Sequence, residues 1–199
     1  GTDTAVFFGN YADYAITFGA TTIVTDNVVG RDGVDMLTGI ERLRFADLTL
    51  IMGDDNPNTL VGTSGIDLIY GLGGNDTIDG GASADTMIGG AGDDRLALTA
   101  GDVAVYSGSI GEYRFTLNNA GTEVIVADQM ANRDGTDVLT DTVFGGDYLL
   151  RLNGTDFRLF SFADNGISYS AVNVGNYVIV GNTGDNEILA GGTSVHYID

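Results

Sequence analysis

The strongest constraint on the fold of this chain is a nine-residue unit that recurs five times without a gap between residues 53 and 97. Position one is always glycine, position six is aspartate or asparagine, and position eight is apolar. Loose Gly-rich turns would not keep an apolar side chain in phase over five units, so the spacing indicates a repeat structure. The units are Gly53–Val61, Gly62–Tyr70, Gly71–Asp79, Gly80–Ile88 and Gly89–Ala97.

The units follow the pattern G-G-x-G-x-D-x-U-x, where U is a large aliphatic residue. Gly71–Asp79 matches it best, and Gly89–Leu96 comes next. In this pattern the chain resembles the RTX (repeats-in-toxin) family of type I secreted bacterial proteins, which carries haemolysin-type calcium-binding repeats. The resemblance implies a parallel β-roll in which each unit makes half a turn. Positions one to six would form a loop, and position eight would point inward from a short strand.

The resemblance also implies Ca²⁺ as the cofactor. Calcium takes six to eight oxygen ligands, more than one loop offers, so each ion is expected between stacked loops. Two units per turn place unit n on unit n+2, which pairs Asn58, Asp76 and Asp94 along one edge. Asp67 and Asp85 pair along the other edge, giving about three interior sites, the weakest at Asn58, whose amide replaces a carboxylate. The candidate ligands, through side chains or loop carbonyls, are Asn58, Gly62, Ser64, Asp67, Gly71, Gly73, Gly74, Asp76, Gly80, Ala82, Asp85, Gly89, Ala91, Gly92 and Asp94.

Two loops depart from the pattern. Pro57 restricts the backbone of Asn56 in the first unit. Ser83 replaces the glycine at position four of the fourth unit, which is a mild departure if its φ is negative.

Charge suggests how such a segment would fold. The chain has 28 acidic and 8 basic residues, which argues against nucleic acid and anionic lipid as partners. Residues 53–97 hold eight acidic residues and one basic residue, so stacking them without cations would be repulsive. Binding free energy then becomes folding free energy. We expect this block to be disordered without calcium, to stay extended in the cytosol, and to fold outside the cell at roughly 10⁻⁴–10⁻³ M calcium.

The segments around the repeats predict short strands. Residues 1–52 are rich in β-branched and aromatic residues at Ala5–Phe8, Tyr14–Phe18 and Thr22–Thr25, and only Thr38–Phe45 suggests a helical turn. Such segments are natural caps, because a bare roll would expose its apolar ladder. The predicted fold class is all-β: a calcium-bound parallel β-roll flanked by antiparallel, strand-rich caps.

The second flank duplicates the first. Asp3–Thr17 aligns with Asp102–Thr116, and Arg31–Thr38 aligns with Arg133–Thr140. Another, degenerate nonapeptide begins at Gly181. The expected organisation is a flank at 1–52, the roll at 53–97, a duplicate flank at 98–180, and the start of another roll or a tail at 181–199.

Two features of the flanks have alternative interpretations. Asp32 and Asp35, like Asp134 and Asp137, belong to D-G-x-D segments that form either hairpin turns or additional calcium sites. The preceding Arg31 and Arg133 are expected to pair with local carboxylates. Aromatic residues at corresponding flank positions form either a small core or a carbohydrate-binding face; they are Phe7, Tyr11, Tyr14, Phe18, Tyr106, Tyr113 and Phe115.

Catalysis is not expected. His196 is the only histidine, the chain has no cysteine, and no serine lies in a G-x-S-x-G elbow. No apolar run is long enough to span a membrane. The expected function is a calcium-binding module of a secreted or cell-surface bacterial protein, with the type I secretion machinery and neighbouring domains of a larger protein as partners. The alternatives are an adhesion or glycan-binding module, or a non-catalytic part of a secreted protease, lipase or peroxidase-like enzyme.

Overall fold

The computed structural model describes residues 1–118, 123–140, 148–161, 169–171, 176–180, 188–190 and 194–198. Strands dominate these residues, and the only helices among them are two short 3-10 turns, η1 (Tyr11–Asp13) and η2 (Ile110–Glu112). The described part of the chain has no helix that is long and apolar enough to cross a membrane. The all-β fold class is confirmed.

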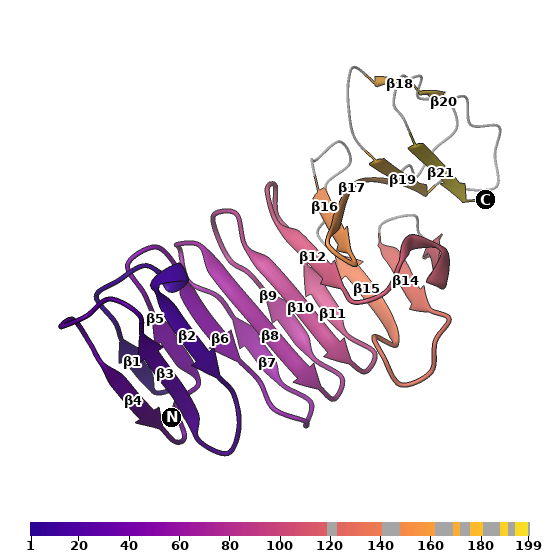
Figure 1. The fold of residues 1–199 in the computed structure, drawn as a ribbon. Coiled ribbons are helices and arrows are strands. Elements are labelled where there is room, and N and C mark those ends of the chain that lie inside the picture. Colours follow the sequence, from indigo (N-terminus) through magenta and orange to yellow (C-terminus); the bar gives the residue numbers. More distant parts are fainter. Residues whose placement is uncertain are drawn as a thin grey trace.

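The centre of the molecule is a parallel β-roll in which each full turn adds one strand to each of two sheets (Figure 1). The larger sheet contains β6 (Thr49–Met52), β8 (Asp67–Gly73), β10 (Thr86–Ala91) and β12 (Val103–Tyr106). The smaller sheet contains β7 (Thr59–Val61), β9 (Thr77–Asp79), β11 (Arg95–Ala97) and β15 (Thr136–Thr140). Ile69 pairs with Met87, and Leu60 pairs with Ile78, so each strand stacks on the strand 18 residues earlier. Two nonapeptides therefore make one turn.

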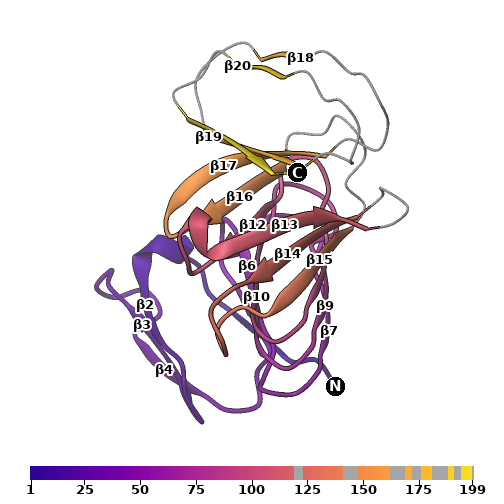
Figure 2. The ribbon, with the colours of Figure 1, turned by 90° about the vertical axis from the view of Figure 1, so that its right-hand side faces the viewer.

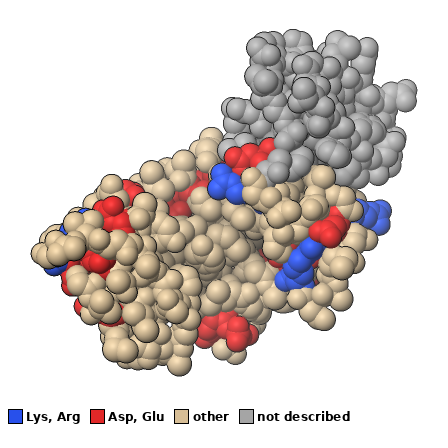
Figure 3. Space-filling view, viewed as in Figure 1, with Lys and Arg blue, Asp and Glu red and all other residues tan. Residues whose placement is uncertain are grey.

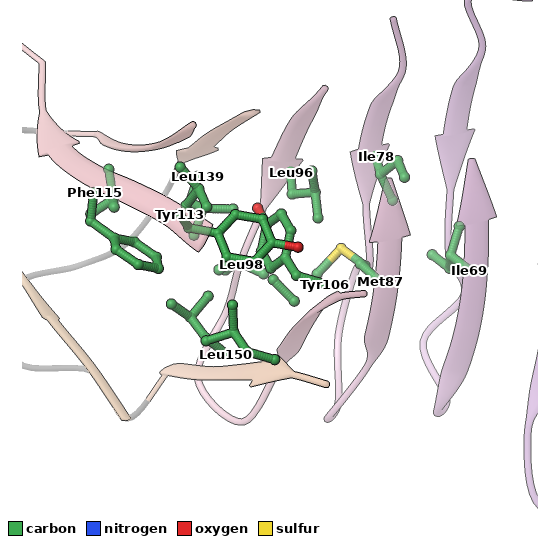
Figure 4. Packing of buried hydrophobic residues seen from close by; sticks show 14 of the residues in the cluster. Ile69, Ile78, Met87, Leu96, Leu98, Tyr106, Tyr113, Phe115, Leu139 and Leu150 are labelled. Carbon is green, nitrogen blue, oxygen red and sulfur yellow. The ribbon is translucent and has the colours of Figure 1, made fainter. Parts of the chain in front are cut away.

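The apolar residues at position eight form the core of the roll. Ile69, Ile78, Met87 and Leu96 are at most 1% exposed, and they belong to one buried cluster (Figure 4). Leu139 of the second flank pairs with Leu96 and belongs to the same cluster, so the core continues beyond the last nonapeptide.

The first flank covers one end of the roll. The expected strands are confirmed as β1 (Thr4–Val6), β2 (Tyr14–Thr17) and β3 (Thr22–Asp26), and β4 (Val34–Leu37) joins β2 and β3 in an antiparallel sheet. The helical turn expected at Thr38–Phe45 is wrong. That segment contains strand β5 (Arg42–Arg44), which pairs with β1 and β6. Leu43 is buried there among aromatic side chains, and this packing decides the local structure.

The second flank repeats the order of elements of the first. After β12 and η2 come β13 (Tyr113–Leu117), β14 (Val124–Asp128) and β15, which form an antiparallel hairpin sheet. β16 (Tyr148–Leu152) then pairs with β12 and β17 (Thr155–Ser161), as β5 pairs with β1 and β6. Unlike β4, strand β15 also pairs with the roll, through β11. Figure 2 shows β13, β14 and β15 side by side, and β2, β3 and β4 as a separate group.

Two of the remaining described strands extend the larger sheet, and the other two form a separate two-stranded sheet. They are β18 (Tyr169–Ala171), β19 (Asn176–Val180), β20 (Ile188–Ala190) and β21 (Ser194–Ile198). β19 pairs in parallel with β17 and β21, and β18 pairs with β20. Most of the degenerate nonapeptide, residues 181–187, and the side chain of His196 lie outside the described residues.

Candidate metal centre

The residues at position six form two ladders of hydrogen bonds between turns. The backbone N–H of Asn58 donates to Oδ1 of Asp76, and the N–H of Asp76 donates to Oδ1 of Asp94, both over 2.8 Å. On the other edge, the N–H of Asp67 donates to Oδ1 of Asp85 over 2.8 Å. These are the pairs that the repeat phase predicts.

Both ladders continue into the second flank. The N–H of Asp94 donates to Oδ1 of Asp137, and the N–H of Asp85 donates to Oδ1 of Asp102, each over 2.8 Å. Asp102 was not among the predicted ligands. It follows Asp85 by 17 residues instead of 18, so a strict nine-residue phase misses it. A search for Gly-Asp before a β-branched residue, with one residue of slack, would have found Gly101-Asp102-Val103.

The second carboxylate oxygen separates the inner members of the ladders from the outer ones. Oδ2 of Asp76, Asp85 and Asp94 is buried and has no hydrogen-bond partner. Leaving a charged oxygen buried and unpaired is costly, so these three atoms are suited to bind a cation. In Asp67 and Asp102, the corresponding Oδ2 accepts a nearby backbone N–H, from Thr63 and Thr99 respectively. The single amide oxygen of Asn58 accepts the N–H of Asp54.

The three loops with an unpaired carboxylate oxygen share an unusual backbone. Positions two and four both have positive φ, a region that side chains other than glycine rarely adopt. The residues are Leu72 and Gly74, Gly81 and Ser83, and Gly90 and Gly92, with φ values between 77° and 140°. No residue at these positions in the first two loops has positive φ. Ser83 has φ +88°, so its replacement of glycine is a strained departure rather than a mild one.

Glycine at position one is required because oxygen atoms converge there. A Cβ on Gly71 would overlap with Oδ2 of Asp76 and with the carbonyl oxygen of Gly89. A Cβ on Gly89 would overlap with Oδ2 of Asp94. Within the described residues, no three Asp, Glu, His or Cys side chains form a metal-binding group, so a cation here would take most of its ligands from carbonyls. An all-oxygen environment with few carboxylates fits a hard cation such as calcium.

Comparison with known families identifies these loops. Residues 52–87, 61–96 and 70–103 match the family described as RTX calcium-binding nonapeptide repeat (4 copies). Residues 52–103 are RTX calcium-binding repeats. No curated protein matches the chain.

Burial is the main cause of the raised pKa values in the two aspartate ladders. It raises the pKa of Asp76, and it raises the pKa of Asp85 and of Asp94 to about 6. Asp137, at the end of the RTX ladder, has a pKa of about 8, chiefly because of burial and also because of the charge of Asp94. A bound cation would favour the ionised forms and reverse these shifts. The face in Figure 3 shows only scattered acidic patches; the ladder aspartates are buried, with 2% exposure or less.

The other acidic residues of the flanks have structural partners. The hydroxyl of Tyr14 donates a hydrogen bond to Asp32, and the hydroxyl of Tyr113 donates one to Asp134. Each also accepts a backbone N–H, from Phe8 in the first flank and from Ser107 in the second. These bonds favour the turn interpretation for Asp32 and Asp134. Asp35 is half-buried on β4, opposite Val24.

The two arginines pair with local carboxylates, as expected. Arg31 contacts Asp26 over 2.7 Å and Asp13 over 2.9 Å. Arg133 contacts Asp128 over 2.6 Å and Glu112 over 2.8 Å. Each guanidinium also lies over a tyrosine ring, at 4.9 Å and 5.1 Å from the centroid. Both arginines therefore hold their own hairpin together.

Most of the flank aromatic residues are core. Five of the seven are buried, Tyr11 is half-buried, and Phe18 is 48% exposed. Phe7, Tyr14 and Phe45 pack with ring centroids 5.1–5.3 Å apart. A continuous aromatic face for a sugar is not formed by these seven residues. The buried residues are Phe7, Tyr14, Tyr106, Tyr113 and Phe115.

Proposed function

We propose that this chain is a calcium-binding module of a secreted bacterial protein that folds when it meets calcium outside the cell. The observation that carries the proposal is the buried, unpaired Oδ2 of Asp76, Asp85 and Asp94. Each lies in a loop of the matched RTX repeats, and each belongs to a carboxylate whose other oxygen already holds two turns together.

Calcium-dependent folding follows from the cost of this arrangement. Without a cation, each turn added to the roll buries another carboxylate whose ionised form is disfavoured. A site built from two turns does not exist in the unfolded chain, so the free energy of ion binding contributes directly to folding. The chain has a formal net charge of −20, which further opposes compaction without cations.

Secretion explains why such coupling would be useful. Cytosolic calcium is far below the roughly 10⁻⁴–10⁻³ M at which extracellular calcium modules bind. The repeats would stay extended during export by type I machinery and fold on arrival, where they hold neighbouring domains of a larger protein in place. We infer that the module is not an enzyme and that its ladder aspartates serve stacking and calcium binding.

A calcium titration of the purified chain, followed by far-ultraviolet circular dichroism and calorimetry, tests the proposal. We expect the β-sheet signal to rise cooperatively with calcium and to fall again after chelation. Magnesium is the matched control, because it prefers a smaller octahedral site with several waters and should not replace calcium. The proposal would be contradicted if the chain bound no calcium, or if its β-sheet signal did not change with calcium concentration.

A further inference from the structure

The loop formed by residues 132–137 of the second flank stacks on the last RTX loop as that loop stacks on the RTX loop before it. The N–H of Asp94 donates to Oδ1 of Asp137 over 2.8 Å, which repeats the bond from Asp76 to Asp94. Position five shows the same relation. The N–H of Thr136 donates to Oδ1 of Asp93 over 2.8 Å, as the N–H of Asp93 donates to Oδ1 of Asn75 over 3.1 Å.

The glycines at position four repeat the arrangement. A Cβ on Gly92 would overlap with the carbonyl oxygen of Gly74, and a Cβ on Gly135 would overlap with the carbonyl oxygen of Gly92. All three glycines have positive φ, at 92°, 140° and 73°. The carbonyl-rich side of the RTX loops is therefore continued by a loop outside residues 52–103.

The sequence of this loop follows the nonapeptide spacing at positions four, six and eight but lacks the first glycine. Asn132–Thr140 has glycine at position four, aspartate at position six and Leu139 at position eight. Asn132 takes the place of the first glycine and adopts φ +60°, a conformation that asparagine tolerates better than most residues. The segment lies 43 residues after the unit on which it stacks, because the strands of the second flank intervene.

We propose that a calcium ion binds between the loop of residues 89–94 and the loop of residues 132–137, with Asp94 and Asp137 as its carboxylate ligands. The independent sign of a ligand is Oδ2 of Asp94, which is buried without a partner in a residue that is 2% exposed. This inference rests on the proposed calcium-dependent function. It makes the second flank part of the calcium array, so that the ion fixes β15 to β11 and couples the fold of the flank to that of the roll.

The first flank supplies a matched control. Gly30–Thr38 has the same phase, with glycine at positions one and four and Asp35 at position six. Its strand β4 pairs only with β3, so no RTX loop lies next to Asp35. Asp35 and Asp137 thus hold equivalent positions in the sequence, but only Asp137 lies on a strand that pairs with the roll.

The test measures the number of calcium ions bound by the full chain and by two variants, using equilibrium dialysis and calorimetry. Asp137→Asn keeps an acceptor for the N–H of Asp94 but removes the charge, and it should bind one ion fewer than the natural chain. Asp35→Asn should bind the natural number. If Asp137→Asn binds as many ions as the natural chain, this inference is wrong while the proposed function stands. If the natural chain binds no calcium, the proposed function itself fails.

A second measurement covers the case in which Asp137→Asn does not fold. The buried hydroxyl of Tyr106 interacts with the charges of both Asp137 and Asp94, so this tyrosine is expected to sensitise terbium bound between them. Terbium that replaces calcium in the natural chain should emit on tyrosine excitation, and Tyr106→Phe should remove a distinct part of that emission. Unchanged emission from Tyr106→Phe would overturn the inference.

A separate observation concerns the free edges of the first flank. β1 and β4 are terminal strands of their sheets, whereas their counterparts β12 and β15 pair with β10 and β11 of the roll. Apolar side chains are exposed at these edges: Val6 is 49% exposed, Val34 65% and Met36 72%. Such edges are normally covered or charged in a soluble protein.

The geometry points to the C-terminal coil of another nonapeptide roll, attached ahead of the flank in the same polypeptide, as the partner of the β1 and β4 edges. The second flank already shows this interface, since β10 and β11 form such a coil and cover the equivalent edges. The partner would bring a position-six carboxylate next to Asp35 and complete a calcium site equivalent to that of Asp94 and Asp137.

A tandem protein, with residues 1–101 followed by residues 3–199, provides the test. Its junction of Gly101 to Asp3 reproduces the natural junction of Gly101 to Asp102. With calcium, peptides covering β1 and β4 should show two populations in hydrogen exchange, one as exposed as in the natural chain and one protected. Asp35→Asn placed in the second copy should now remove one bound calcium. A single, unprotected population would overturn the assignment of this partner.

Discussion

Asp94 uses its two carboxylate oxygens differently: Oδ1 accepts the backbone N–H of Asp76 over 2.8 Å, while Oδ2 is buried without a partner. The same division occurs at Asp76, whose Oδ1 accepts the N–H of Asn58. One side chain therefore joins adjacent turns and leaves an oxygen for a cation. Stacking and ion binding are thus properties of the same residues.

The position-six residues should not be equivalent. Asp76→Ala removes both an acceptor for a buried N–H and a free carboxylate oxygen, whereas Oδ1 of Asn58 already accepts the N–H of Asp54. We expect Asp76→Ala to raise the calcium concentration at the folding midpoint by about fivefold or more, since losing one buried partner costs about 1–3 kcal/mol. Asn58→Ala should raise it much less. Equal shifts in a calcium titration would contradict this division of roles.

Position-four glycines should differ between loops. Gly92→Ala places a Cβ against the carbonyl oxygen of Gly74 at φ +140°, so we expect a loss of stability of more than about 1–3 kcal/mol. Gly65→Ala lies at the same position of another loop, where the nearest atom is 3.7 Å from the added Cβ and φ is not positive. It should be neutral or stabilise by about 0.4–1 kcal/mol. Urea unfolding at saturating calcium compares the two, and a harmless Gly92→Ala would rule out the loop geometry.

The apolar ladder predicts a large effect at position eight. Ile78 is fully buried between Leu60 and Leu96, so Ile78→Ala should lower the free energy of unfolding by about 2–5 kcal/mol in saturating calcium. Val61 has 49% exposure at position nine, and Val61→Ala is the control, with little expected change. Similar unfolding midpoints for both variants would show that position eight does not form the core.

Acid should partly replace calcium. In the folded chain without calcium, burial holds the pKa of Asp85 and of Asp94 at about 6 and that of Asp137 at about 8, above the usual value near 3.9. The folded state then binds more protons than the unfolded state, so its stability is greatest at low pH and is lost as pH rises through 6 and then 8.

With excess chelator, the chain should accordingly show more β-sheet at pH 5 than at pH 8. The carboxyl of Asp26 has a lowered pKa, because Arg31 pairs with it, and this flank contact survives at pH 5. Circular dichroism at the two values is the measurement. Equal or weaker β-sheet signal at pH 5 would show that the buried carboxylates do not oppose folding.

Much of the roll is predictable because a single nine-residue repeat determines which residues stack and which are buried. Glycine, aspartate and an aliphatic residue in a nine-residue phase are enough to pair Asn58 with Asp76 and to bury Ile78. Strands β1 to β3 were likewise predictable from β-branched and aromatic residues. Local pattern succeeds where each residue contacts its neighbours in the next turn.

The parts that were missed depend on contacts that the period does not contain. Asp102 follows its ladder neighbour Asp85 by 17 residues, and Asp137 follows Asp94 by 43. A strict nine-residue spacing therefore finds neither. The local pattern of Thr38–Phe45 predicts a helical turn, but this segment contains strand β5, because its backbone pairs with β1 and β6. The φ of +88° at Ser83 follows from the stacking of its loop, which imposes a glycine conformation on serine.

The central claim is that calcium between stacked loops holds the roll together. Hydrogen exchange of the full chain, with calcium and with chelator, tests this directly, because it measures the protection of strands β8 to β11 separately from that of the flanks. We expect strong protection of these strands with calcium and its loss after chelation at pH 8. Protection of β8 to β11 that is unchanged by chelation would show that calcium does not hold the roll together.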